Sequence, residues 1–229
     1  MVQIAESVET IPVQYREGRA SFMGMSVKVD SRVLIPRPET ELLVTVAARL
    51  LSEKKWSKPF VLDVGTGSGI IPLGLMQLID DCRIIGTDKS TEALTLAREN
   101  IMHFDREDRV ALFASDMFSG FNRTYEGAFN CVVSNPPYVS EKDYGQLDAW
   151  VKTEPRQALY AGAEGMDYLN IIARESGRFI TTGGFVAVEV GYDQAEKVKK
   201  AFHERGFKDI AGFRDFNGYE RVIVGWKRG

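Results

Sequence analysis

A glycine-rich turn, Gly65-Thr66-Gly67-Ser68-Gly69, lies between an apolar run that ends at Val64 and a helical pattern that begins at Ile70. Glycines let the backbone turn sharply and let a ligand approach the peptide plane closely. Asp88 closes the next predicted strand, where a carboxylate can accept hydrogen bonds from both hydroxyls of a ribose. The spacing G-x-G-x-G differs from the G-x-G-x-x-G that dinucleotides prefer, and a structural turn with a helix-capping aspartate is the alternative. The order strand, turn, helix, strand and acid favours a site for an adenosine ligand.

The segment Ser134-Asn135-Pro136-Pro137-Tyr138 directly follows another predicted strand. Its consecutive prolines fix the backbone and remove two N–H donors, so the backbone carbonyls beside them lack local partners. The side-chain carbonyl of Asn135 can lie beside such a backbone carbonyl, and the two acceptors together suit one NH₂ group. Tyr138 would supply a flat wall for a planar group. A loop that merely ends a strand is the alternative, but its place after a central strand favours ligand binding.

The elements that must position these residues alternate between β-rich runs and helical periodicity, which is typical of an α/β domain with a parallel sheet. A turn signal, Asn217-Gly218, separates two further β-like runs and predicts a terminal hairpin, so one strand should enter the sheet antiparallel. The predicted strands are residues 60–64, 83–88, 110–115, 130–134, 184–190, 207–216 and 219–226. The predicted helices are residues 70–79, 91–104, with Ser90 as N-cap, 166–181 and 193–205.

An N-terminal unit precedes this pattern. The runs 22–28 and 31–34 flank Val29-Asp30 and predict a small β-hairpin. Pro36-Arg37-Pro38 then ends the extended segment and begins a helix that runs to about Lys55, with Glu39 and Glu41 near the positive end of its dipole. We therefore expect a unit over residues 1–55 and a core over residues 56–229.

Composition excludes several classes of protein. The chain has 229 residues, 44% of them apolar and 27% charged, and is neither disordered nor collagenous. A net charge of −3 gives no overall attraction to nucleic acid or to an anionic membrane. Cys82 and Cys131 are separated by 48 residues without a metal-binding spacing, so we expect no disulfide framework, no zinc site and a reducing, cytoplasmic setting. No apolar run is long enough for a membrane span, and the N-terminus lacks the basic-then-apolar pattern of a signal peptide.

The N-P-P-Y segment together with V-L-D-V-G-T-G-S-G resembles those class I S-adenosylmethionine-dependent methyltransferases that methylate planar amino or amide nitrogens. Residues 32–41, 134–139 and 154–159 resemble, in that order, the release factor glutamine methyltransferase family, called HemK or PrmC. The resemblance covers residues 11–226. It implies a Rossmann-like seven-stranded methyltransferase sheet, mostly parallel with an antiparallel C-terminal strand.

The resemblance also implies roles for individual residues. Those expected to bind S-adenosylmethionine are Asp63, Gly65, Thr66, Gly67, Ser68, Gly69, Asp88, Asp116, Met117, Asn135, Arg37, Glu39 and Thr40. Those expected to hold the substrate are Asn135, Pro136, Pro137, Tyr138, Glu154 and Arg156, with Asn135, Pro136 and Tyr138 the catalytic group. No metal and no general base is expected. Structural alternatives are a first-turn role for Glu39 and Glu41, a loop-shaping ion pair between Glu154 and Arg156, and packing or loop roles for Tyr15, Tyr144 and Tyr168.

The implied activity is N5-methylation of the glutamine in the Gly-Gly-Gln motif of a peptide-chain release factor. Bacterial members usually carry an N-terminal helical domain that contacts the release factor, and we expect it to be absent here. The alternatives are a truncated chain, another mode of substrate recognition, or a paralogue that methylates a ribosomal protein. Two further readings are an adenine-N6 nucleic-acid methyltransferase, which the mild acidity disfavours, and a non-catalytic cofactor-binding scaffold, which the intact Asn135 and Asp88 disfavour.

Overall fold

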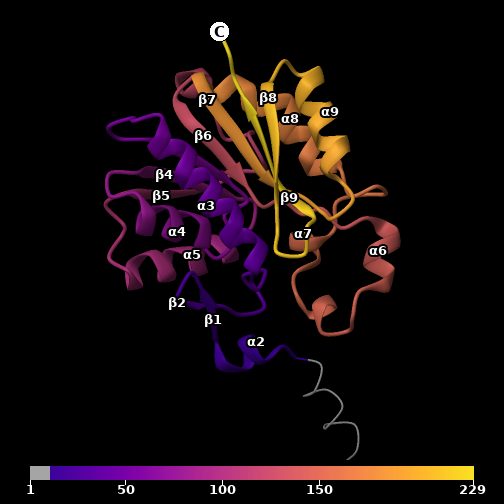
Figure 1. The fold of residues 1–229 in the computed structure, drawn as a ribbon. Helices are drawn as coiled ribbons and strands as arrows, with labels where there is room; N and C mark the ends of the chain where they lie inside the picture. Colours follow the sequence, from indigo (N-terminus) through magenta and orange to yellow (C-terminus); the bar gives the residue numbers. More distant parts are fainter. Residues whose placement is uncertain (1–10) are drawn as a thin grey trace, which may run out of the picture.

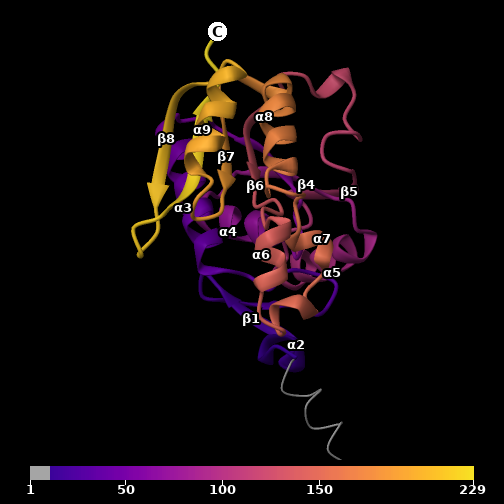
Figure 2. The same cartoon turned by 90° about the vertical axis from the view of Figure 1, so that its right-hand side faces the viewer.

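The computed structural model describes residues 11–229, which form a seven-stranded sheet covered on both faces by helices (Figures 1 and 2). The sheet order is β5-β4-β3-β6-β7-β9-β8. Its strands are β3 (Phe60–Val64), β4 (Arg83–Asp88), β5 (Val110–Ala114), β6 (Phe129–Ser134), β7 (Ile180–Glu189), β8 (Lys208–Arg214) and β9 (Glu220–Trp226). Strand β9 pairs antiparallel with both β7 and β8, and the other neighbours are parallel. The predicted fold class and the antiparallel C-terminal strand are confirmed.

Two hydrophobic cores lie on opposite faces of this sheet. Successive side chains of a strand point to opposite faces of the sheet. In β3, Val61 accordingly belongs to the first core and Leu62 to the second. The first core is covered by α3 (Pro38–Glu53), α4 (Ile70–Leu78) and α5 (Thr91–His103). The second is covered by α8 (Asp167–Phe179) and α9 (Ala195–Glu204). Within residues 11–229, no helix has the length and apolarity that crossing a membrane requires.

Short elements complete the fold. A helix α2 (Val13–Glu17) precedes the hairpin of β1 (Arg19–Phe22) and β2 (Met25–Lys28), and η1 (Arg123–Tyr125) precedes β6. The connection from β6 to α8 carries α6 (Glu141–Gln146), η2 (Val151–Thr153) and α7 (Arg156–Leu159). This long insertion begins at the carboxyl end of β6. It therefore lies over the edge of the sheet where open α/β folds bind ligands.

The structure contains the predicted N-terminal hairpin, but at a different position in the sequence. Its turn is Met23-Gly24, not Val29-Asp30, because both turn residues adopt positive φ, 48° and 77°, as a tight hairpin requires. Residues 31–34 form no strand. Instead Asp30 accepts hydrogen bonds from the Arg32 backbone and guanidinium, which bends this segment. The first ten residues of the predicted unit over residues 1–55 lie outside the described part of the chain.

Other boundaries agree to within a few residues, with one informative exception. Helix α3 begins at Pro38 as predicted, and the Ser90 side chain accepts a hydrogen bond from the Ala93 N–H at 3.1 Å, as an N-cap does. Strand β7, however, begins at Ile180 rather than at residue 184, and α8 ends at Phe179. The run Ile180-Thr181-Thr182 is β-branched, which favours the strand over another helical turn.

Candidate active site

The glycine-rich turn joins β3 to α4 at the carboxyl edge of the sheet. Gly65, Gly67 and Gly69 all have positive φ, 77°, 54° and 80°, a region that side-chain-bearing residues rarely adopt. A Cβ on Gly65 or Gly67 would meet nothing within 4 Å, whereas one on Gly69 would lie 3.4 Å from Ala97. The first two glycines therefore leave open space beside the backbone, and the third allows close packing of α4 on α5.

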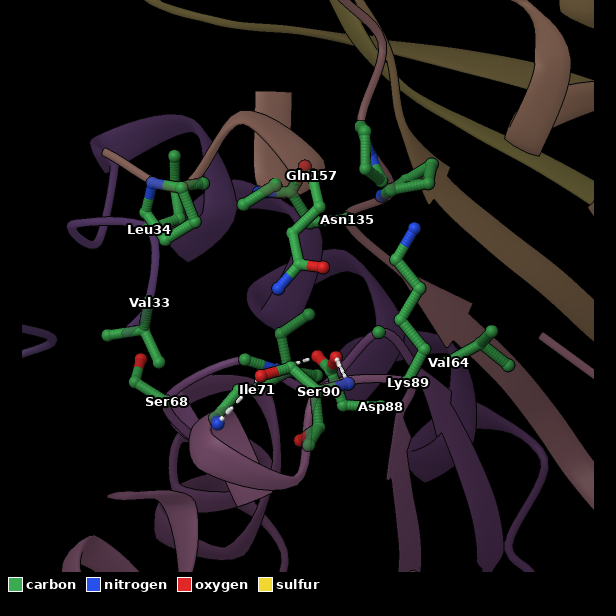
Figure 3. A pocket seen from close by; sticks show the side chains of 18 of the residues that line it. Val33, Leu34, Val64, Ser68, Ile71, Asp88, Lys89, Ser90, Asn135 and Gln157 are labelled. Carbon is green, nitrogen blue, oxygen red and sulfur yellow. Dashed lines mark hydrogen bonds between the residues drawn. The ribbon is translucent and has the colours of Figure 1, made fainter. Parts of the chain in front are cut away.

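Asp88, at the end of β4, holds this turn in place. Its Oδ2 accepts a hydrogen bond from the Gly67 N–H at 3.0 Å, and its Oδ1 accepts one from the Ser90 N–H at 2.9 Å (Figure 3). Burial raises the pKa of Asp88, and these N–H groups oppose that shift. Each oxygen keeps a further lone pair, so the carboxylate can accept additional hydrogen bonds from a ligand.

Asp63 is fully buried beside the same turn. Neither of its carboxylate oxygens has a hydrogen-bond partner among residues 11–229. Burial raises its pKa to about 7; the neighbouring Thr66 hydroxyl opposes that shift, and the Asp88 carboxylate adds to it. A buried carboxyl without a partner costs stability. A cationic ligand bound near the turn would offset part of this cost.

A cavity of about 920 Å³, its open mouth included, lies over the turn. Gln157, in α7, points its side-chain amide into this space (Figure 3). The structure brings together at its wall most of the residues that the sequence predicts: Arg37, Thr40, Gly65, Thr66, Gly67, Ser68, Asp88, Asp116, Met117, Asn135, Pro136 and Pro137. The predicted residues that do not line it are Glu39, Asp63, Gly69, Tyr138, Glu154 and Arg156.

The loop after β5 presents Met117 to this cavity in a constrained conformation. Met117 has a positive φ of 50°, which costs a residue with a side chain on the order of 1–3 kcal/mol. The Ser115 hydroxyl donates to the Met117 carbonyl at 2.8 Å and accepts from the Gly120 N–H at 3.0 Å. These bonds fix the loop, so the thioether is held at the cavity wall.

Asn135 begins a chain of hydrogen bonds that runs away from the cavity into the protein. Its Nδ2 donates to the Thr40 Oγ1 at 3.0 Å, and the Thr40 hydroxyl donates to the Glu189 Oε2 at 2.7 Å. A threonine hydroxyl has one hydrogen to donate. Because that hydrogen is used toward Glu189, Thr40 must accept from Asn135. The orientation of the Asn135 amide is thereby set, and its Oδ1 accepts no hydrogen bond from the described part of the chain.

Glu189, at the end of β7, is the inner anchor of this chain. Its other oxygen accepts a hydrogen bond from the Tyr138 hydroxyl at 3.2 Å. Burial raises the pKa of Glu189 to about 7, and the bonds from Thr40 and Tyr138 oppose the shift. Burial also raises the pKa of Tyr138, as does the Glu189 carboxylate. Tyr138 therefore packs behind the site rather than forming the cavity wall that the sequence predicts.

Glu154 and Arg156 differ from their predicted ion pair. Glu154 is buried, pairs with Arg37, and accepts the Ile35 N–H at 3.0 Å, so it fastens the N-terminal segment to the insertion. The Arg156 guanidinium lies 4.3 Å from the centre of the Tyr160 ring. The two side chains therefore have different partners and do not pair with each other. Glu41, expected as a first-turn acid, accepts the Met23 N–H at 2.7 Å and fixes the hairpin turn to α3.

Sequence reasoning also missed four residues. Lys89 and Tyr168 line the cavity, with the lysine Nζ 2.7 Å from the tyrosine hydroxyl. Gln157 lines it within the predicted 154–159 segment. Lys89 directly follows Asp88 in the sequence, and Gln157 lies within residues 154–159, so sequence position could have indicated both. Glu189 gave no local signal, because its partners lie 149 and 51 residues away in the sequence.

Comparison with known proteins relates this geometry to a family. Residues 40–160 match the model of the methyltransferase small domain. The release factor glutamine methyltransferase of Caulobacter vibrioides is 36% identical over 94% of this chain and 73% of that relative. The enzyme of the same name from Streptococcus pneumoniae is 38% identical over 93% of this chain and 74% of that relative.

This chain belongs to the release factor glutamine methyltransferase family. Its methyl donor is accordingly S-adenosylmethionine, as predicted. The solved protein-(glutamine-N5) methyltransferase of Alicyclobacillus acidocaldarius is 26% identical, with a TM-score of 0.51 over 88% of this chain and 99% of that one. The glutamine methyltransferase family therefore accounts for both the sequence motifs and the fold.

Proposed function

We propose that this chain transfers a methyl group from S-adenosylmethionine to the side-chain amide nitrogen of a glutamine in the Gly-Gly-Gln motif of a peptide-chain release factor. The observation that carries the proposal is the orientation of Asn135, whose Nδ2 is bound to Thr40 while its Oδ1 is left as an acceptor. The family relationship supports the release factor as partner. Such a substrate implies a cytoplasmic reaction.

The residues around the glycine turn fit the cofactor. The open space beside Gly65 and Gly67 suits a ligand that lies against the backbone. Asp88 would accept the ribose hydroxyls, and the Asp63 carboxyl, buried behind the glycine turn, would favour the cationic amino group of the methionine part by its charge without touching it. Asp116 would lie beside the adenine, with the fixed Met117 thioether covering its ring. When bound, the cofactor supplies an electrophilic methyl group on a good leaving group.

The chain's own contribution is to orient a poor nucleophile. The lone pair of an amide nitrogen is delocalised into its carbonyl. The Oδ1 of Asn135 and the Pro136 carbonyl would accept the two amide hydrogens and turn that lone pair toward the cofactor. Positioning two bound reactants in line is worth several kcal/mol by itself. The proton released after transfer would leave to water, so no residue is assigned as general base.

The N-terminal unit would act as a lid on this site. Residues 32–34, 36, 37 and 40 line the cavity together with the glycine turn. The Arg37–Glu154 ion pair and the Thr40–Glu189 hydrogen bond connect this segment to the insertion and to β7. We propose that residues 1–55, described from residue 11, enclose the cofactor and that residues 56–229 form the catalytic core.

Replacing Asp88 by alanine is expected to weaken cofactor binding by about 10–150-fold, because one charge-assisted hydrogen bond contributes roughly 1.5–3 kcal/mol. Isothermal titration calorimetry with S-adenosylmethionine would measure the change. Glu92→Ala, an exposed acid in the first turn of α5, is the matched control. Since Asp88 also fixes the glycine turn, thermal unfolding of the variant should be recorded. Unchanged affinity in a folded variant would refute the ribose assignment.

Labelled S-adenosylmethionine tests the proposed function directly. The chain would be incubated separately with a release factor, a ribosomal protein and DNA, and the modified atom mapped by mass spectrometry. We expect label on the glutamine N5 of the release factor. Label on nucleic acid alone, or on the ribosomal protein alone, would overturn the proposed substrate.

A further inference from the structure

The exposed aromatic side chains gather at one edge of the sheet. Among residues 11–229, the strongly exposed aromatics are Trp150, Tyr192, Phe216 and Tyr219, at 42%, 60%, 110% and 49% exposure. Trp150 lies in the insertion after β6, and Tyr192 follows β7. Phe216 and Tyr219 lie in the turn from β8 to β9, at the end of a strand parallel to β7. All four therefore lie at the carboxyl edge, where Asn135 lies.

The β8–β9 turn presents Phe216 on a rigid support. Asp215 is the centre of that support: its Oδ1 accepts the N–H groups of Asn217 and Tyr219 at 2.9 and 3.0 Å. Its Oδ2 forms an ion pair with Arg221 at 3.1 Å, and its side chain is only 7% exposed. The turn thus fixes a fully exposed apolar ring in one backbone geometry. Pre-organised aromatic groups of this kind lose little entropy on binding and dominate protein interfaces.

This aromatic turn lies at the same edge of the sheet as the site. Arg221 and Val190 are joined by a backbone hydrogen bond of 2.9 Å, directly beyond the pair of Glu189 and Val222. Strand β9 is the second neighbour of β6 and β8 the third, so strand spacings of about 4.8 Å place them roughly 10 and 14 Å from β6 across the sheet, and the turn extends further beyond the carboxyl edge. Figure 2 shows the turn between β8 and β9 projecting from the sheet at the level of α6 and α7.

We propose that Phe216, Tyr219 and Tyr192 form a docking surface for the folded body of the protein substrate, next to the loop that carries the methylated glutamine. The inference rests on the proposed function. Aromatic anchors are enriched in protein interfaces, and the net charge of −3 does not favour a nucleic acid. A protein domain that delivers a loop to Asn135 must contact this edge of the sheet.

The test compares an intact release factor with a short peptide that contains Gly-Gly-Gln. Phe216→Ser combined with Tyr192→Ser should raise KM for the intact protein about tenfold and leave kcat unchanged. The same variant should methylate the peptide as the wild type does, because the peptide reaches only the cavity. Met102→Ser, which replaces an apolar residue 55% exposed on α5, is the matched control and should change neither substrate.

The outcomes separate the docking surface from the proposed function. An unchanged KM for the intact protein, with normal methylation of the peptide, would overturn the docking surface alone. Failure of the wild type to methylate either substrate would instead overturn the proposed function. Sedimentation of the wild type as a dimer that the double variant abolishes would assign the surface to a second copy of the chain and also overturn the inference.

Discussion

Asn135→Ala is expected to lower kcat by about 10–100-fold, because the loss of one buried hydrogen-bond partner is worth roughly 1–3 kcal/mol. The substitution removes the Oδ1 that would accept one hydrogen of the substrate amide. It also leaves the Thr40 hydroxyl without the N–H that it accepts at 3.0 Å. Initial rates at saturating cofactor and release factor would measure the change. Affinity for S-adenosylmethionine should change much less, because the turn and Asp88 are untouched.

Two comparisons isolate the role of Asn135. Asn122→Ala removes an exposed asparagine side chain that caps the short helix η1 before β6 begins, outside the residues that line the cavity, and should leave kcat unchanged. Asn135→Asp keeps Oδ1 but replaces the N–H donor with a second oxygen, so it should lose the bond to Thr40 and fall between the wild type and the alanine variant. Near-normal turnover of Asn135→Ala would contradict the proposed grip on the amide.

The parts of the fold that were predictable follow from local patterns. Buried strands such as Phe60–Val64 are apolar runs, interrupted here only by Asp63, and the Asn217-Gly218 turn fixes the reversal that makes β9 antiparallel. The glycine turn and Asn135 could be placed at one edge because parallel strands all end there. The N-terminal hairpin was misplaced because Met23-Gly24 and Val29-Asp30 are both plausible turns, and only Met23-Gly24 lets Phe22 and Val27 face the core.

The parts of the site that were not predictable depend on tertiary contacts. The sequence suggests that Glu154 pairs with the nearby Arg156. In the structure it pairs instead with Arg37, 117 residues away in the sequence. Tyr138 follows two prolines in a binding motif, yet it packs against the second core. Glu189 ends an apolar strand and resembles any acid at a strand terminus. Its role depends on where α3 places Thr40, which no sequence periodicity specifies.

The hydrogen bonds that link Asn135, Thr40 and Glu189 have a donor-to-acceptor direction, and that direction depends on whether Glu189 is ionised. An ionised Glu189 accepts from Thr40, which then accepts from Asn135. A protonated Glu189 would donate to one of its two hydroxyl neighbours. The phenol oxygen of Tyr138 is the poorer acceptor, so the proton would face Thr40. Thr40 would then donate toward Asn135, whose amide would turn its Oδ1 away from the substrate.

The wild-type kcat is therefore expected to rise with pH through about 7, the pKa to which burial raises Glu189, and to fall about tenfold per pH unit below it. Stability should move oppositely. Because the folded pKa of about 7 exceeds the unfolded value of 4.5, the folded state holds the proton more tightly, and the free energy of unfolding should fall as pH rises between them. Asp63, whose pKa burial also raises to about 7, adds to that fall.

Glu189→Gln separates these effects. Its side chain keeps the size of glutamate and offers one carbonyl to Thr40, but it does not titrate. We expect its kcat to vary little between pH 6 and 8, measured at saturating cofactor so that titration of Asp63 does not enter. The decline of stability with pH should become shallower without disappearing, since Asp63 remains. A variant whose kcat falls below pH 7 as steeply as that of the wild type would show that another group titrates and that Glu189 does not set the orientation of Asn135.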